Sequence, residues 1–291
     1  MDAELIAMQL FSGVALGAIL IMVALGLSII FGMLGVVNFA HGALFMVGAY
    51  AGLWVASLTG SFWWGLLIAP IAIGVFGMAI ERVLIRPLYK RSVDDPLLLT
   101  FGLGYVLVEA VRIVFGSDGI PFAAPPQLAG VADLGIGFFP IYRLFVVGVV
   151  AAVLLLLWLG LEKTKLGLIV RAGARDPLIM RVLGVDVGRV WLLVFGLGVG
   201  LTALGGVLSA PMRNVSPEMG SLVLAEAFVV TVIGGMGSLV GAVVAGLLVG
   251  VSISITALFA PEMGTIVMFG LMALVLLVRP QGLFGKPLAG A

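Results

Sequence analysis

The sequence predicts an all-α, polytopic membrane protein, and three observations carry this prediction. Hydrophobic residues make up 63% of the 291 positions and charged residues only 10%, whereas soluble domains are about 25% charged. The mean hydropathy is +1.32. Long apolar runs such as 145–161 lack the alternation of barrel strands. Water does not tolerate so much apolar surface, so we expect a helical bundle in lipid.

The nine longest apolar stretches define the expected spans. A hydrocarbon core of about 30 Å requires about 20 helical residues. The stretches lie near 8–31, 39–58, 62–80, 97–116, 144–161, 190–210, 221–236, 239–260 and 263–278. Two of them are short, so we expect eight to nine spans in a single transmembrane domain over 1–291. Residues 221–260 form either two full spans or a re-entrant hairpin.

The basic residues predict the orientation, because short cytoplasmic loops are rich in Lys and Arg. Twelve of the fifteen lie in three connections, namely Arg82, Arg86, Lys90 and Arg91, then Lys163, Lys165, Arg171, Arg175, Arg181 and Arg189, then Arg279 and Lys286. The start carries only the acids Asp2 and Glu4. We expect an outer N-terminus, a cytoplasmic C-terminus and no cleavable signal, since the first apolar run is too long for one.

The outer connection 116–143 contains four prolines and is expected to be irregular. No stretch fits a glycine-rich phosphate loop. The energy for any transport must therefore come from a partner or a gradient. No Cys, a single His and scattered carboxylates predict no metal site, no cofactor and no enzyme.

The cytoplasmic connection 162–189 contains a predicted two-turn helix. Asp176 can cap it, Pro177 suits its first position and Gly184 can end it. Its apolar stripe is Leu178, Ile179, Val182 and Leu183, and its flanking cations are Arg175 and Arg181. Such a helix either docks into a groove on a soluble partner or lies among lipid headgroups.

Two glycine-rich segments are expected to interrupt helices at membrane depth, because glycine weakens helices and accepts positive φ. Their glycines are Gly32, Gly35 and Gly42 in the first segment and Gly234, Gly235 and Gly237 in the second. Broken helices line protein or a water-filled path. The alternative is close helix packing through small residues, which Gly241, Ala242, Ala245 and Gly246 favour for the second segment.

Polar residues inside the spans are candidates for the translocation path. Asn38 and His41 either hold the first break through backbone bonds or face the path. Glu109 and Arg112 stand one helical turn apart and can pair. Glu226 lies in the seventh span with no obvious local cation. It is therefore a functional candidate.

Four motifs resemble the permease subunits of bacterial ABC importers for branched-chain amino acids. Asn38-Phe39-Ala40-His41-Gly42 is similar to a family motif, and Phe11 to Gly17 looks like the family's first span. Gly234 to Ser238 with Gly241-Ala242 matches its late glycine motif, and Arg279 to Gly285 resembles its terminal signature. They occur in the family's order across nearly the whole chain.

The resemblance implies a permease subunit of the bacterial inner membrane. It implies three kinds of partner besides membrane lipid: a second homologous permease, two cytoplasmic ATPases and an outer solute-binding protein. The net charge of +1 gives no indication of a nucleic-acid partner. Residues 171–186 would then be the ATPase-coupling segment. Relatives carry urea, amides or aromatic acids, so these substrates remain alternatives to amino acids. A gradient-driven transporter remains the alternative to an ATP-driven importer.

Overall fold

The computed structural model describes residues 3–89, 91–92, 94–133, 135 and 137–285. Asp2, Lys90 and Lys286, which entered the prediction of orientation, lie outside these residues. The described residues form eleven α-helices and one two-stranded hairpin, which confirms the all-α polytopic class. The helices are α1 Ala3–Leu34, α2 His41–Thr59, α3 Phe62–Ile80, α4 Asp94–Phe115, α5 Ile141–Lys163, α6 Lys165–Arg175, α7 Pro177–Val182, α8 Val187–Ser209, α9 Met219–Gly234, α10 Leu239–Phe259 and α11 Gly264–Val278.

Eight helical segments of the described residues are long and apolar enough to cross a bilayer. They contain α1, α2, α3, α4, α5, α8, α10 and α11. The ninth apolar helix, α9, has 16 residues. At 1.5 Å per residue it is about 24 Å long, which is shorter than the hydrocarbon core. Residues 221–260 therefore pair a short helix with a helix of full crossing length.

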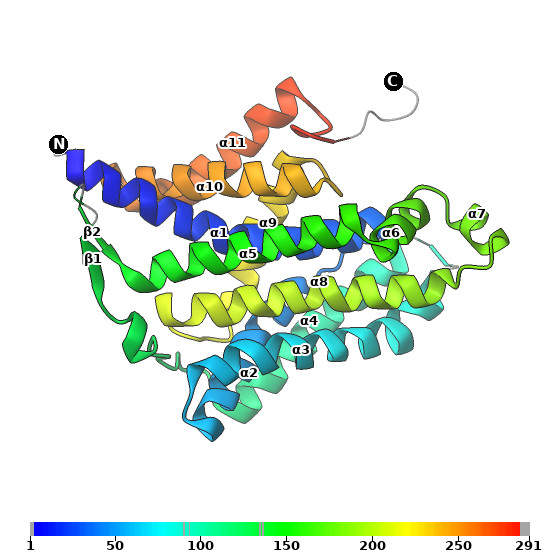
Figure 1. The fold of residues 1–291 in the computed structure, drawn as a ribbon, viewed down its shortest axis with the longest axis horizontal. Coiled ribbons are helices and arrows are strands. Elements are labelled where there is room, and N and C mark those ends of the chain that lie inside the picture. Colours follow the sequence, from blue (N-terminus) through cyan, green and yellow to red (C-terminus); the bar gives the residue numbers. More distant parts are fainter. Residues whose placement is uncertain (1–2, 90, 93, 134, 136, 286–291) are drawn as a thin grey trace.

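Helix α1 is the centre of the bundle. Its apolar window is 78% buried within the chain, whereas that of α5 is 11% buried. Helix α1 packs against α8, α9 and α10, while α2 and α3 pack on α8 (Figure 1). Small residues permit the closest crossing, because a Cβ on Gly13 would come within 2.7 Å of the Val251 backbone on α10.

The two ends of the bundle carry different structures. Figure 1 shows the β-hairpin beside the start of α1 at one end, while α6 packs at the other end and α7 projects beyond it. The start of α5 and the end of α8 meet at the hairpin end, where the Tyr142 hydroxyl donates to the Leu208 carbonyl over 2.8 Å. The connection 116–143 and the charged connection 162–189 therefore lie at opposite ends of the bundle.

Three local structures in the two connections were not predicted. The expected irregular segment 116–143 contains strands β1 Val131–Asp133 and β2 Phe138–Pro140, paired antiparallel, and a 3₁₀ turn at Pro126–Leu128. The charged connection contains α6, whose first turn is capped by the Thr164 hydroxyl accepting from the Gly167 amide. The prolines of this segment are compatible with the hairpin, since β2 ends at Pro140 and the edge of a sheet tolerates a missing N–H.

Candidate functional site

Helix α7 has the start and stop that its sequence predicts. The Asp176 carboxylate accepts hydrogen bonds from the amides of Leu178 and Ile179, both at 3.0 Å. At the other end Gly184 has φ +82°. The amide of Gly184 bonds the Arg181 carbonyl, and the amide of Val185 bonds the Met180 carbonyl. This pair of bonds is a Schellman cap, which satisfies carbonyls that the helix leaves free.

The apolar stripe of α7 is exposed. Leu178, Ile179, Val182 and Leu183 are 56% to 81% exposed, and Met180 is the buried residue of the helix. Three of these side chains lie on the six-residue helix and the fourth belongs to its C-cap residue, Leu183. Single exposed apolar residues are common on protein surfaces, but a cluster of four forms an apolar patch. The arrangement supports contact with another surface, whether a protein groove or the lipid headgroups.

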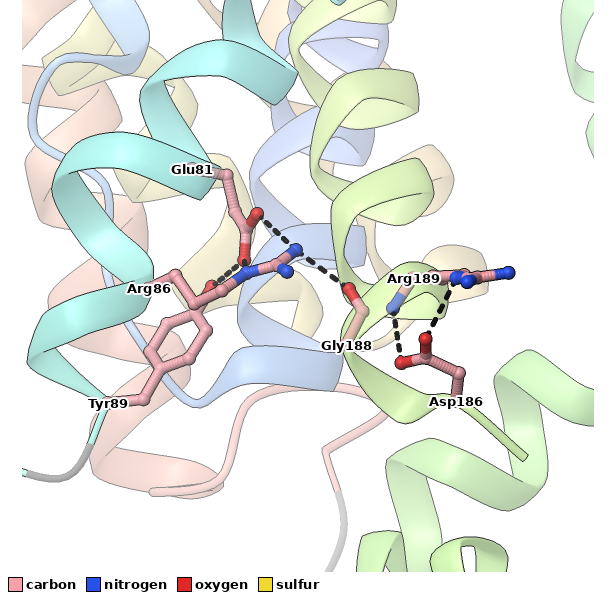
Figure 2. Close-up of polar contacts among 6 residues, drawn as sticks. All are labelled: Glu81, Arg86, Tyr89, Asp186, Gly188 and Arg189. Carbon is pink, nitrogen blue, oxygen red and sulfur yellow. Dashed lines mark hydrogen bonds and ion pairs between the residues drawn. The ribbon is translucent and has the colours of Figure 1, made fainter. Parts of the chain in front are cut away.

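A buried ion pair joins the end of α3 to the start of α8 (Figure 2). Glu81, in the π-helical turn after α3, is fully buried and accepts from Arg86 Nε at 3.1 Å and Nη2 at 2.8 Å. Arg86 Nη2 also donates to the Gly188 carbonyl at 2.9 Å, and the Tyr89 hydroxyl donates to Glu81 at 2.9 Å. Burial, reinforced by the Glu81 carboxylate, raises the pKa of Tyr89, so its hydroxyl stays a donor.

The same junction connects to α7 through aromatic contacts. The Trp191 ring on α8 meets the Tyr89 ring edge-on, with centroids 5.2 Å apart. The Arg181 guanidinium lies 5.9 Å from the centroid of Trp191. Asp186 caps α8 by accepting from the Arg189 amide at 3.1 Å. The sequence predicted Arg86 only as a cytoplasmic cation. The one feature that could have indicated an ion pair here is the acidic residue Glu81, which directly follows the apolar run 62–80.

The first glycine segment is a short loop between α1 and α2. Gly35 has φ +64° directly after α1, whereas Gly32 and Gly42 are helical, so the break is narrower than expected. Asn38 is buried, and its side-chain oxygen accepts from the Ala40 amide at 3.0 Å. The Phe39 amide donates to the Thr100 hydroxyl on α4 at 3.1 Å.

His41 lies where α1, α2 and α8 cross. It is fully buried, with Nε2 3.0 Å from the Val23 carbonyl and 2.6 Å from the Thr202 hydroxyl. The Thr202 hydroxyl donates to the Gly198 carbonyl, so Nε2 carries the proton and donates to both oxygens. Both side chains, Asn38 and His41, are therefore buried and hydrogen-bonded within the protein, and their part in a translocation path stays a prediction.

The second glycine segment is a tight turn between α9 and α10. Gly234 ends α9, while Gly235 and Gly237 have positive φ. A Cβ on Gly234 would clash with the Gly241 backbone, which is the close packing that the sequence allowed as an alternative. The terminal signature packs here as well, since the amides of Leu283 and Phe284 donate to the carbonyls of Ile233 and Gly234.

Glu109 and Arg112 of α4 form ion pairs, whereas Glu226 of α9 forms none in the described part of the chain. Arg112 bonds Glu109 at 2.5 Å, as predicted, and also Glu218, just before α9, at 2.9 Å. Glu226 on α9 is half-buried, and its Oε2 has no hydrogen-bond partner among the described residues. Glu226 forms no ion pair among the described residues, so its role stays a prediction.

Comparison with known proteins identifies the family to which this chain is similar. Residues 9–276 match the family model described as the branched-chain amino acid transport system permease component. The chain is 32% identical to the high-affinity branched-chain amino acid transport system permease protein BraD of Pseudomonas aeruginosa, over 96% of this chain and 95% of that protein. It is 29% identical to LivH of Escherichia coli K12 over the same shares. It is also 30% identical to LivM of that strain, over 91% of this chain and 67% of LivM.

A solved structure shares the fold. The complex titled PsaBC from Streptococcus pneumoniae with Fab aligns with a TM-score of 0.52 and 15% identity, covering 94% of this chain and 92% of that one. The match of 268 residues to the family model is far more specific than this likeness of fold. The chain belongs to the family of branched-chain amino acid transport system permease components.

Proposed function

We propose that the chain is the membrane-spanning subunit of an ATP-driven importer that carries branched-chain or related amino acids across the inner membrane. In this role α7 docks on a cytoplasmic ATPase subunit, a second permease completes the path, and an outer solute-binding protein delivers the substrate. The observation that carries the proposal is the exposed apolar stripe of α7 on a helix with both ends capped.

The rigidity of α7 supports docking over loose lipid contact. Its Asp176 cap and Schellman cap fix both ends, so little ordering entropy is lost on binding a groove. A sequence without a phosphate-binding loop must obtain ATP-derived force from another subunit.

The buried junction provides a route for that force. Displacement of α7 reaches Trp191 through Arg181, and Trp191 packs on Tyr89. Tyr89 and Arg86 both bond Glu81, which follows α3 directly. Because α3 and α8 also pack against each other, a push on α7 moves these two helices together.

Loss of ATPase association tests the docking. Leu178→Asp with Ile179→Asp should abolish copurification of the ATPase subunits, since two carboxylates would have to be desolvated in the groove. Val131→Asp is the matched control, because Val131 is 61% exposed on the outer hairpin. Copurification unchanged by the double variant would refute the docking.

The substrate is tested separately by competition. Uptake of labelled leucine by the assembled transporter should be inhibited by unlabelled valine and isoleucine and unaffected by urea, amides or aromatic acids. Absence of leucine uptake, together with uptake of labelled urea, a labelled amide or a labelled aromatic acid, would assign the same importer to that other class.

A further inference from the structure

We propose that the chain holds an anionic phospholipid in a pocket between α1, α5 and α10 at the end of the bundle that carries α6. The pocket encloses about 600 Å³, within the range of ligand sites in proteins. Its wall is apolar and comes from three helices, with Leu25 and Ile29 on α1, Leu154 and Leu157 on α5, and Val240 and Val243 on α10. This wall matches an acyl chain.

The rim of the pocket is charged. Glu162, Arg171 and Arg175 line it, and Arg171 pairs with Glu162 at 3.2 Å. Arg175 is exposed and forms no ion pair among the described residues. The three charged lining residues, one acid and two arginines, give the rim a net positive charge. Cations at the end of an apolar pocket complement a phosphate headgroup.

The depth of the rim agrees with a headgroup. Trp158 lines the pocket and is 53% exposed, and the Lys163 ammonium lies 5.5 Å from its ring centroid. Tryptophans of this kind sit at the boundary between headgroups and hydrocarbon. The arginines therefore lie at headgroup level and the apolar wall lies below it.

A polar group inside the pocket has no partner within the protein. Ser28 on α1 is 1% exposed and lines the pocket, and its hydroxyl makes no hydrogen bond among the described residues. It lies five residues before Met33, which adjoins Gly173 of α6. This places Ser28 about 7.5 Å below the rim. An ester carbonyl of a phospholipid is an acceptor that this hydroxyl can satisfy.

Lipid retention by the full chain in detergent tests the site without any variant. Phosphatidylglycerol and phosphatidylcholine with the same acyl chains are added in competition, and bound lipid is counted by native mass spectrometry. We expect phosphatidylglycerol to be retained at least about tenfold more strongly, because each rim cation favours the anion. Equal retention of the two lipids would overturn the proposal.

Two substitutions locate the lipid. Val243→Phe fills the pocket and should reduce phosphatidylglycerol retention about tenfold, whereas Val244→Phe, next to it on α10 but outside the lining, should not. Arg175→Gln should lower the preference for the anionic lipid, and Arg82→Gln is its control as an exposed cation elsewhere. Phosphatidylglycerol retention unchanged by Val243→Phe would overturn the assignment of the lipid to this pocket.

Discussion

Removing Arg86 should destabilise the protein more than any other single change at the α3–α8 junction. Arg86→Met keeps much of the side-chain volume but deletes the guanidinium. Glu81 is fully buried and would lose two charge-assisted hydrogen bonds, keeping only the Tyr89 hydroxyl. The Gly188 carbonyl would lose its bond as well.

The size of the effect follows from the asymmetric burial of the pair. Breaking a buried pair by removing one partner costs about 3–5 kcal/mol, because the other charge stays buried. The Arg86 side chain is 34% exposed, so water partly reaches the site and the lower end, about 3 kcal/mol, applies. Glu81→Gln should cost less, about 1–2 kcal/mol, because the exposed guanidinium can be hydrated.

The free energy of unfolding in mixed micelles, titrated with a denaturing detergent, measures both effects. Arg82→Met is the matched control, since Arg82 is an exposed cation in the π-helical turn just before Arg86 and forms no ion pair among the described residues. It should change stability by less than about 0.5 kcal/mol. Equal losses for the Arg86 and Arg82 variants, or a larger loss for Glu81→Gln, would refute the reasoning.

Three further predictions concern the helix contacts and the acids. Gly42→Ala should lower the free energy of unfolding by about 2–3 kcal/mol, because its Cβ would clash with the Gly220 carbonyl. The control Gly102→Ala, whose Cβ would enter open space, should be neutral or stabilising. Equal unfolding free energies for the two variants would contradict this packing. The side-chain oxygen of Glu226 that has no partner among the described residues is expected to serve transport, so Glu226→Gln should slow uptake about tenfold, equivalent to about 1.4 kcal/mol. An unchanged uptake rate and pH profile would assign Glu226 to packing. Arg112, by bonding Glu218, holds the pKa of Glu218 below its ordinary value of 4.5. A carboxyl group whose pKa is lowered in the folded protein contributes stability above its ordinary pKa, and this stability is lost as the pH falls. The wild type should therefore lose more stability than Arg112→Gln between about pH 5 and pH 3. Parallel curves of unfolding free energy against pH would exclude the effect.

Features set by neighbouring residues were predicted well from the sequence. The cap of α7 depends on Asp176 and the amides two and three residues later, and its end depends on Gly184. The start and the end of α7 could therefore be predicted from one short stretch of sequence. The spans were found because lipid demands long apolar runs, and their ends differ from the structure by a few residues, as at 97–116 against Asp94–Phe115.

Features that join distant residues were not predicted. Glu81 and Gly188 are more than one hundred residues apart, and only the packing of α3 on α8 brings Arg86 between them. Two motifs likewise meet only in the fold, where the amides of Leu283 and Phe284 bond the end of α9. The hairpin was missed because its strands are three residues each, too short for a periodic pattern.

Uptake by reconstituted vesicles tests most directly whether the chain is a conduit driven by a separate motor. The chain is placed in proteoliposomes with its second permease and ATPase subunits, with the solute-binding protein outside and labelled leucine as substrate. The account predicts accumulation that requires ATP and the binding protein and disappears with Leu178→Asp and Ile179→Asp. Accumulation by the chain alone, driven by an ion gradient without ATP, would contradict it.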